Sequence, residues 1–273
     1  PDFFSDAPCG ANLLSGFVRL NDDGLLVLEE HSPEHMQRSV INCKWVPNIT
    51  GEFSGYTRIL LDGCFGESDT ELKSLLLEII GVTILGVSTR MKAPKGIVFF
   101  GATASNGKST ILNLIRLLLP RTATCSIPPS DFEKEQSLAT LVGKTANLTD
   151  EISTYKSIAS DKMKSLITGD IVAAKIVYQP VFNFQPIATH IFATNELPNF
   201  KGGVDAGVER RMLVIPFTKT IPEEKRVTNL EQLIADKEAS FLVSEAINIG
   251  SKAYQRGTFD IPVSCNAATE QWF

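Results

Sequence analysis

The tetrapeptide Gly-Lys-Ser-Thr at 107–110 lies between an apolar run and an amphipathic one. Residues 97–101 are four bulky apolar residues followed by glycine, which predicts a buried strand. Residues 111–119 repeat apolar side chains at helical spacing and stop at Pro120, which predicts a helix. The expected apolar face of this helix is Ile111, Leu114, Ile115 and Leu118. A strand, a loop of small residues and a helix in this order predict an α/β unit.

The same tetrapeptide predicts a phosphate-binding loop (P-loop). Backbone N–H groups of such a loop cradle phosphates, and the positive end of the helix dipole adds to the attraction. We therefore expect ATP and Mg²⁺ here, with the Lys108 ammonium on the terminal phosphates and the Ser109 hydroxyl on the metal. The expected nucleotide-binding residues are Ala104, Ser105, Asn106, Gly107, Lys108, Ser109 and Thr110. Ala102 stands where the pattern usually has glycine, so an ordinary helix N-terminus is the alternative.

Length and composition limit the remaining possibilities. The 273 residues are 43% hydrophobic, enough for one large domain or one to two ordinary ones. No apolar run reaches the roughly 18 residues of a membrane span, so no membrane partner is expected. Five scattered cysteines favour reduced thiols in a cytoplasmic compartment over a disulfide framework or a zinc site. The chain does not begin with methionine, so we expect it to be a fragment of a longer protein.

Charge is distributed unevenly along the chain. Residues 1–95 hold 8 basic and 13 acidic side chains, whereas residues 96–273 hold 18 of each. The net charge of −5 therefore belongs to the N-terminal part and argues mildly against a nucleic-acid binder. A narrow basic strip inside a ring or channel would still be compatible with it.

Three segments follow from the sequence pattern. Residues 1–95 are rich in turn residues, with a helix expected at 70–81 that ends at Gly81, and they predict a smaller irregular or α-helical N-terminal region. Residues 96–220 alternate apolar strands with helical segments and predict an ATPase core with a central parallel sheet. Its strands are expected at 97–101, 121–127, 144–150, 187–194 and 211–217. Residues 221–273 predict a C-terminal helical segment, with a helix over 229–256.

Asp150 and Glu151 follow an apolar strand some forty residues after the P-loop. This position is typical of a Walker B motif. Asp150 would hold Mg²⁺ and Glu151 would polarise the attacking water as a general base. The alternative is a charged pair that caps a helix beginning near Ser153 or Thr154.

Two further polar positions stand at strand ends. Asn195 follows an apolar strand, and α/β sheets bind ligands at the carboxyl ends of their strands. Its alternative is an ordinary turn residue before Leu-Pro. Arg210 and Arg211 precede the next strand, and a guanidinium group can donate two hydrogen bonds to phosphate oxygens at once. Their alternative is surface ion pairing with Glu209 or Asp205.

These motifs together resemble the superfamily 3 helicases, and more narrowly the helicase module of poxvirus-type and phage or plasmid primase-helicases. The resemblance rests on the Ser-Asn-Gly-Lys-Ser-Thr loop, Asp150-Glu151, a Thr-Gly-Asp block at 168–170, Asn195 and the Arg210-Arg211 pair. It implies an AAA+-like ATPase that assembles into a ring, usually a hexamer, and hydrolyses ATP at subunit interfaces. It also implies a 3′-to-5′ motor on single-stranded DNA, with a primase or polymerase domain upstream in the full-length protein.

The resemblance assigns roles to matching positions. Asn195 matches the sensor asparagine, and Arg210 or Arg211 matches the arginine finger that acts on a neighbouring subunit's ATP, with Arg210 favoured. Residues 164–184 match the region that tracks DNA, and their alternation predicts a hairpin around Tyr178–Pro180. DNA contacts are then expected from Lys175, Tyr178 and Gln179. For Tyr178 and Phe182 the alternative is packing in the sheet.

Two other function classes compete with this interpretation. A P-loop phosphotransferase would need an acceptor pocket and a mobile, often arginine-rich lid, and residues 217–273 show no arginine cluster. A scaffold or DNA-loading platform would bind ATP for assembly alone and would not need a water-activating base such as Glu151.

Overall fold

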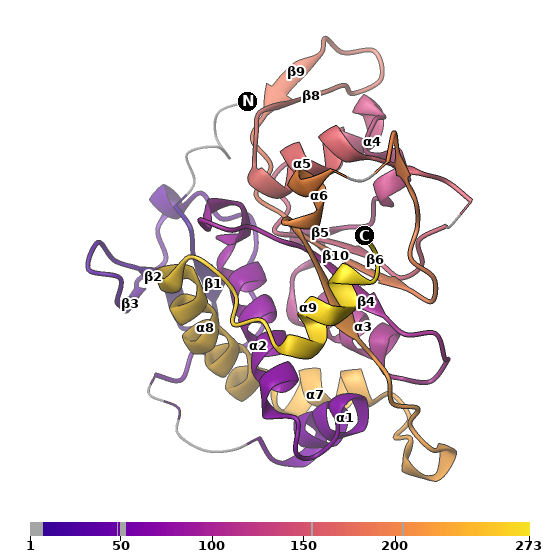
Figure 1. The fold of residues 1–273 in the computed structure, drawn as a ribbon. Coiled ribbons are helices and arrows are strands. Elements are labelled where there is room, and N and C mark those ends of the chain that lie inside the picture. The colour runs from indigo at the N-terminus through magenta and orange to yellow at the C-terminus, as the bar shows by residue number, and fades with distance from the viewer. Residues whose placement is uncertain (1–7, 48, 50–52, 154, 204) are drawn as a thin grey trace.

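The central feature of the chain is a parallel five-stranded sheet. In the computed structural model, which describes residues 8–47, 49, 53–153, 155–203 and 205–273, the strands lie in the order β12-β4-β10-β6-β5 (Figure 1). Every neighbouring pair in this sheet is parallel. The five strands are β4 (Gly96–Phe100), β5 (Thr124–Cys125), β6 (Ala146–Thr149), β10 (Thr189–Thr194) and β12 (Met212–Pro216).

The predicted α/β unit with a parallel sheet is therefore confirmed. Each of the five predicted strand segments contributes a strand, because apolar side chains on both faces suit a sheet covered on both sides. The prediction of a strand over 121–127 is wrong at its start: Arg121–Ala123 form a 3₁₀ turn after Pro120, and β5 has only two residues.

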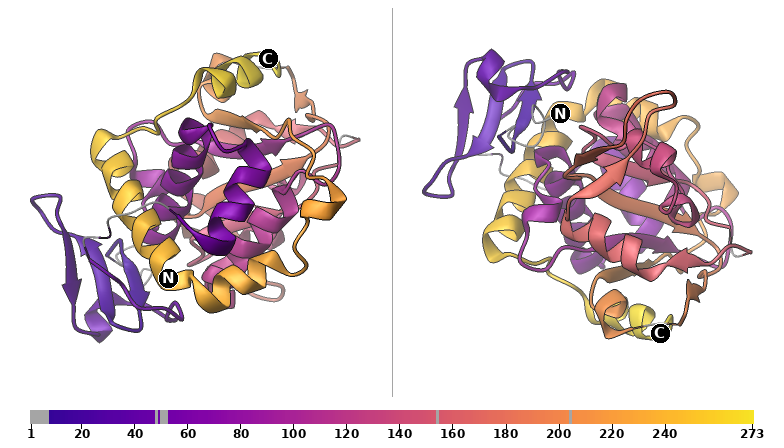
Figure 2. Two further views of the ribbon diagram at one scale, coloured as in Figure 1. Left: turned by 90° about the horizontal axis from the view of Figure 1, so that it is seen from below. Right: turned by 90° about the horizontal axis from the view of Figure 1, so that it is seen from above.

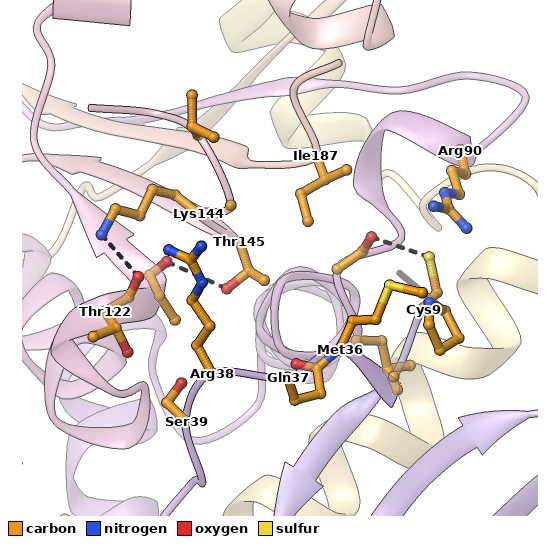
Figure 3. A pocket seen from close by; sticks show the side chains of 17 residues that line it. Cys9, Met36, Gln37, Arg38, Ser39, Arg90, Thr122, Lys144, Thr145 and Ile187 are labelled. Atoms are coloured by element: carbon orange, nitrogen blue, oxygen red, sulfur yellow. Dashed lines mark hydrogen bonds between the residues drawn. The ribbon is translucent and has the colours of Figure 1, made fainter. Parts of the chain in front are cut away.

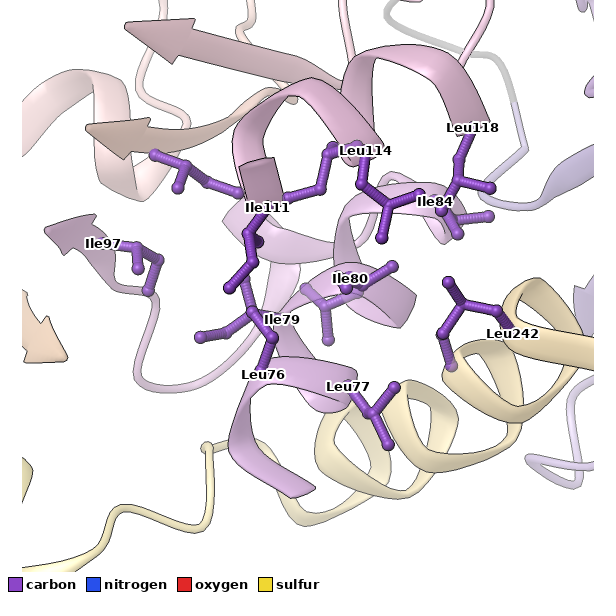
Figure 4. Packing of buried hydrophobic residues seen from close by; sticks show 14 of the residues in the cluster. Leu76, Leu77, Ile79, Ile80, Ile84, Ile97, Ile111, Leu114, Leu118 and Leu242 are labelled. Carbon is purple, nitrogen blue, oxygen red and sulfur yellow. The ribbon is translucent and has the colours of Figure 1, made fainter. Parts of the chain in front are cut away.

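One face of the sheet carries the larger hydrophobic core. Side chains of alternate strand residues such as Ile97 point toward α2 and α3, and α8 packs behind α2 (Figure 4). All four residues of the predicted apolar face of α3 are buried there. The helices on this side are α1 (Gly55–Phe65), α2 (Thr70–Leu85), α3 (Lys108–Leu118), α7 (Leu230–Lys237) and α8 (Ala239–Arg256).

A second core covers the opposite face, where Val98, Phe192 and Val214 meet residues from shorter elements. This face also carries a small antiparallel hairpin, β8–β9, which extends away from the body of the molecule at the top of Figure 1. The elements on this side are α4 (Glu135–Ala139), β7 (Ile158–Ala159), α5 (Ser160–Thr168), β8 (Val172–Ala174), β9 (Phe182–Phe184), β11 (Phe200–Lys201) and α6 (Ala206–Glu209). α9 (Val263–Glu270) packs along β12 and reaches both cores, the first through Cys265 and the second through Ala268.

Helix α2 runs past the end predicted for it. It continues through Gly81 to Leu85 and ends at Gly86, which adopts the left-handed φ of 64° that favours glycine. Gly81 instead allows a close helix crossing: a Cβ there would lie 1.8 Å from the carbonyl oxygen of Ala246, and Gly250 approaches from the same helix, α8. Gly81 therefore allows α2 and α8 to pack closely and does not end α2.

The helix predicted over 229–256 is two helices. The break falls at Glu238, whose φ of −125° is outside the helical range. Its carboxylate accepts hydrogen bonds from the backbone N–H groups of Tyr56 and Thr57, at 2.8 and 2.7 Å, and so caps the N-terminus of α1. The interruption thus fixes α1 against the C-terminal helices.

The prediction of an irregular or helical N-terminal region is wrong for residues 11–29. They form an antiparallel sheet of β1 (Ala11–Leu13), β2 (Gly16–Leu20) and β3 (Leu26–Glu29), which lies at one side of the molecule beside α8 (Figure 2). The turn residues at 21–24 close the hairpin between β2 and β3, with Gly24 at a φ of 78°.

The N-terminal and C-terminal segments also contact each other directly. Helix α2 packs along α8, and both contribute to the core beneath α3. Within the described ranges, no helix is both long enough and apolar enough to cross a lipid bilayer.

Candidate nucleotide-binding site

The predicted P-loop follows β4 and leads directly into α3. Gly107 precedes the helix with a φ of 89°, and Ser105 takes a left-handed φ of 58° without being glycine. The loop is held from outside by a backbone hydrogen bond of 2.8 Å from Ile221 N–H to the Ser105 carbonyl. A non-glycine residue in this conformation costs about 1–2 kcal/mol, so the surrounding contacts hold the loop in a defined shape.

Lys108 is the buried charge at the centre of this loop. Its side chain is 6% exposed, and its ammonium group donates to the Gly101 carbonyl at 2.9 Å, to Asn106 Oδ1 at 3.2 Å and to Asn195 Oδ1 at 3.0 Å. Burial lowers the pKa of Lys108 below its usual value. In the described part of the chain no carboxylate is bonded to the ammonium, which is solvated by three neutral oxygens and has no counter-charge in contact.

The sheet brings Asn195 to this position. β10 lies beside β4, with Thr194 opposite Phe100, so the residues that follow the two strands emerge at the same edge. Asn195 is the first residue after β10, and its amide oxygen reaches Lys108 across the gap between the strands. The prediction that this asparagine lies at the carboxyl end of a strand, near the P-loop, is thus met by the geometry.

Asn106 supports the lysine rather than facing outward. It is 3% exposed, accepts from Lys108 and donates its amide N–H to the Thr103 carbonyl at 2.6 Å. By contrast, Ala104 and Ser109 are exposed, and Thr110 is half-buried. The outer rim of the loop is therefore open to solvent while Lys108 and Asn106 line its inside.

A hollow of about 260 Å³ adjoins the P-loop. It is bounded by Ser105, Gly107 and Thr110 on one side. Residues of α1 and of the segment 221–230 complete it, namely Ile59, Leu60, Ile221, Lys225, Arg226, Val227 and Leu230. The walls combine apolar side chains with Lys225, Arg226 and two hydroxyl residues, and a concave site of mixed apolar and polar lining has the character of a small-molecule site.

Asp150 lies after β6, one strand further along the same edge of the sheet. β6 pairs with β10, with Thr149 opposite Phe192. The Asp150 carboxylate is half-exposed and bonds to the guanidinium of Arg116 on α3, with Nη1 to Oδ1 at 2.9 Å. Arg116 also donates to the Leu148 carbonyl at 3.0 Å and to Asn113 Oδ1 at 2.8 Å.

Arg116 was not anticipated from the sequence. Arg116 lies near the end of α3, outside the apolar face from which the helix was predicted. The one available signal was its spacing of seven residues, or two helical turns, from Ser109. In this structure Asp150 is directed to Arg116, and no contact joins Asp150 to Lys108 or Asn195 in the described part of the chain.

Glu151 follows Asp150 at an exposed position. The alternative of a pair that caps the next helix is not supported at Ser153, because the next helix, α5, begins at Ser160. Thr154 lies outside the described residues. Across the described ranges, no group of three histidine, cysteine, aspartate or glutamate side chains could hold a metal ion.

Arg210 and Arg211 lie at the amino ends of the parallel strands, on the opposite side of the sheet from the P-loop. They precede β12, and the Arg211 carbonyl accepts a hydrogen bond of 2.8 Å from the N–H of Gly96, the first residue of β4. Arg211 donates its guanidinium to the Gly207 carbonyl at 2.8 Å, whereas Arg210 is exposed. The length of β4, at about 3.3 Å per residue, therefore separates both arginines from the P-loop of their own chain.

The predicted hairpin is present. β8 and β9 pair antiparallel, with Val172 opposite Phe184. The tip carries Lys175, Tyr178 and Gln179, all exposed, and Tyr178 has a left-handed φ of 65°. The alternative of sheet packing is wrong for Tyr178 but right for Phe182, which contacts Phe184 and the second core.

Comparisons with known proteins agree with this architecture. A family model described as a family of unknown function, DUF5906, matches residues 99–211, the range that spans the P-loop, Asp150, Asn195 and the arginine pair. A search of curated proteins found no match.

Among solved structures, an apo structure of the NrS-1 C-terminal region matches with a TM-score of 0.62, 16% sequence identity, 84% of this chain and 55% of that one. A second apo structure of that region, its A form, matches with a TM-score of 0.59 at the same identity and coverage. The chain thus spans about half the length of the structures it matches. It has an α/β fold with a parallel sheet like that of the NrS-1 C-terminal region.

Proposed function

We propose that the chain is the ATP-hydrolysing helicase module of a replication protein from a virus, phage or mobile element. The observation that carries the proposal is the convergence of Lys108, Asn106 and Asn195 at the carboxyl edge of the sheet. A buried ammonium held by neutral oxygens is suited to exchange one of them for a phosphate oxygen. β10 lies between β4 and β6, so Asn195 emerges between the predicted P-loop and Asp150.

The hydrogen-bond donors at the carboxyl ends of the strands suit the phosphates of ATP. The backbone of residues 104–107 and the N-terminus of α3 would bind its phosphates, and the hollow beside Ser105 and Thr110 has partly apolar walls suited to its base. Mg²⁺ takes few protein ligands and usually keeps water and phosphate oxygens. Ser109 and Asp150 would supply those ligands, and the metal would neutralise charge on the phosphates.

Binding of Mg²⁺ at Asp150 requires a change in its present partner. The carboxylate is paired with Arg116, so it must release this guanidinium or share it with the metal. The same pairing favours a second candidate function, a scaffold that binds ATP for assembly without hydrolysing it. Glu151, exposed at the same edge, favours hydrolysis.

The arginine pair supports a ring assembly. Arg210 points outward at the edge remote from its own P-loop, so it can reach a nucleotide only on a neighbouring copy. The guanidinium of Arg211 already donates a hydrogen bond to the Gly207 carbonyl, which favours Arg210 as the arginine finger. A hexamer, 3′-to-5′ polarity and an upstream primase or polymerase domain are proposed from the resemblance.

The hairpin supports contact with single-stranded DNA. One exposed Lys175 and one Tyr178 per subunit would form a belt around a central pore, where the lysines meet phosphates and the tyrosines stack on bases. Such contacts are independent of sequence, which suits a motor.

The test is steady-state ATP hydrolysis with and without single-stranded DNA. We expect stimulation by DNA but not by small hydroxyl acceptors, and we expect Lys108→Ala to lower turnover by at least about 10²-fold. Lys252→Ala, which removes an exposed lysine from α8, is the control. Nucleotide binding without any turnover would favour the scaffold, and unchanged turnover in Lys108→Ala would remove the P-loop assignment.

A further inference from the structure

A second cavity, of about 160 Å³, lies at the amino ends of the parallel strands, opposite the end that carries the P-loop. Residues that precede β5, β6 and β10 line it, among them Thr122, Thr145 and Ile187 (Figure 3). Its other walls come from the end of α2 and from residues 36–39. β6 and β10, of four and six residues at about 3.3 Å each, separate the two ends of the sheet, so this cavity is distinct from the proposed ATP site.

Three cationic side chains line this cavity. Arg38 and Lys144 lie together on one side of it, and Arg90 lies on the other side near Cys9 (Figure 3). Among the lining residues that the structure describes, none is a carboxylate. Arg38 and Arg90 make further contacts within the chain, so the inference rests on the placement of Arg38 beside Lys144, with Arg90 across the cavity.

Lys144 is oriented by the fold. Its ammonium donates to the Thr122 carbonyl at 2.8 Å, which holds the group at the cavity wall with donor capacity remaining. The hydroxyl groups of Ser39 and Thr122 belong to the same lining. Cations and hydroxyl donors on several chain segments therefore face one small volume.

The cavity joins two parts of the chain. Arg38 and Arg90 come from residues 1–95, which carry a net charge of −5, and Lys144 comes from the segment that holds the parallel sheet. Cations from both parts therefore border one cavity whose described lining contains no carboxylate.

We propose that this cavity binds a phosphate group. Arginine forks onto phosphate oxygens and lysine adds a compact charge, while the hydroxyl groups supply further donors. The volume is below the roughly 300 Å³ of pockets that enclose whole drug-sized ligands, so the cavity takes the phosphate rather than an entire nucleotide. The phosphate belongs either to the backbone of a nucleic-acid strand or to a small phosphate ester.

The experiment compares two probes on one set of variants. Inorganic phosphate is titrated by calorimetry and a short fluorescein-labelled oligothymidylate by anisotropy, both in a Lys108→Ala background so that the P-loop does not contribute. The test variant carries Arg38→Met with Lys144→Met, and the control carries Lys44→Met with Lys252→Met. Both variants lose two positive charges, and the two control lysines are exposed.

We expect the test variant to lose at least about tenfold in affinity relative to the control. A loss for the oligothymidylate identifies the nucleic-acid backbone as the source, and a loss for phosphate alone identifies a small phosphate ester. If both probes bind the test variant within about twofold of the control, the proposal is overturned. Arg90→Met is the second test variant, and thermal melting verifies that each protein is folded.

Discussion

The amide oxygen of Asn195 accepts a hydrogen bond of 3.0 Å from the ammonium of Lys108, although 87 residues separate the two in the chain. The contact exists because β4 and β10 are parallel neighbours whose carboxyl ends meet at one edge. It joins the P-loop to the strand beside it before any ligand binds. The proposed chemistry depends on this link, since a phosphate that enters the loop meets both side chains at once.

If the proposed function is right, Arg116 competes with Mg²⁺ for Asp150. Its guanidinium bonds to the carboxylate, so removal of the side chain leaves Asp150 available. We predict that Arg116→Ala lowers the Mg²⁺ concentration needed for half-maximal ATP hydrolysis by several-fold. It should also cost about 1 kcal/mol of stability, through the lost bond to the Leu148 carbonyl.

The measurement is a Mg²⁺ titration of hydrolysis at fixed ATP, with urea unfolding alongside it. Arg121→Ala, which removes an exposed arginine beyond the end of α3, is the control. A lower Mg²⁺ concentration for half-maximal hydrolysis in Arg116→Ala than in Arg121→Ala supports Asp150 as a ligand. An unchanged titration would argue that Asp150 is structural.

Arg210 is predicted to act on the ATP of a neighbouring subunit. The edge of the sheet that carries it lies away from its own P-loop. Arg210→Ala and Glu151→Gln proteins should each be inactive, but a mixture should regain part of the activity, because some interfaces then combine an intact Glu151 with an intact Arg210.

The readout is ATP hydrolysis across a series of mixing ratios. Arg211→Ala mixed with Glu151→Gln serves for comparison, since Arg211 is bonded to Gly207 and is expected to act on folding more than on turnover. No recovery at any ratio would count against action between subunits.

Gly81 is predicted to be essential for the crossing of α2 and α8. A methyl group at this position would lie 1.8 Å from the Ala246 carbonyl oxygen, so the two helices would have to separate. Gly81→Ala should lower the free energy of unfolding by about 3 kcal/mol. Gly63→Ala in α1 is the control, because its nearest contact is a flexible Ile221 side chain at 3.3 Å and alanine favours the helix.

Urea unfolding measures both variants. The account of the crossing is contradicted if the two substitutions change stability by the same amount.

His190 should make the fold sensitive to acid. Burial lowers its pKa to about 4, and the imidazole lies against Phe132 with Nδ1 accepting from the Asn147 amide at 3.1 Å. An unfolded chain binds the proton first, near pH 6.5, so the free energy of unfolding falls as the pH drops from about 6.5 to about 4. The expected loss is on the order of 3 kcal/mol.

Unfolding curves across this pH range provide the measurement. His190→Gln should flatten the dependence, and His31→Gln, at an exposed histidine, should leave it as in the natural chain. An equal pH slope in all three proteins would refute the role of His190.

The sequence predicted the parts that depend on local pattern. The apolar face of α3, the five strand segments and the hairpin at 172–184 follow from periodicity that one segment contains by itself. Asn195 was also predicted at the right strand end, because all parallel strands deliver their following residues to one edge.

Features that depend on distant partners were missed. Gly81 resembles a helix end until α8 is seen beside it, and Glu238 belongs to a helix by pattern yet caps α1, some 180 residues away. The pairing of Arg116 with Asp150 requires knowledge of the strand order. The N-terminal sheet was missed because its turn residues were interpreted as irregular structure rather than as a hairpin.

The most direct test is a structure of the chain with Mg²⁺ and a non-hydrolysable ATP analogue. The account predicts the terminal phosphate within about 3 Å of the Lys108 ammonium, with Asn195 beside it and Asp150 turned from Arg116 toward the metal. A nucleotide bound elsewhere, with Lys108 still bonded to Gly101, Asn106 and Asn195, would contradict it.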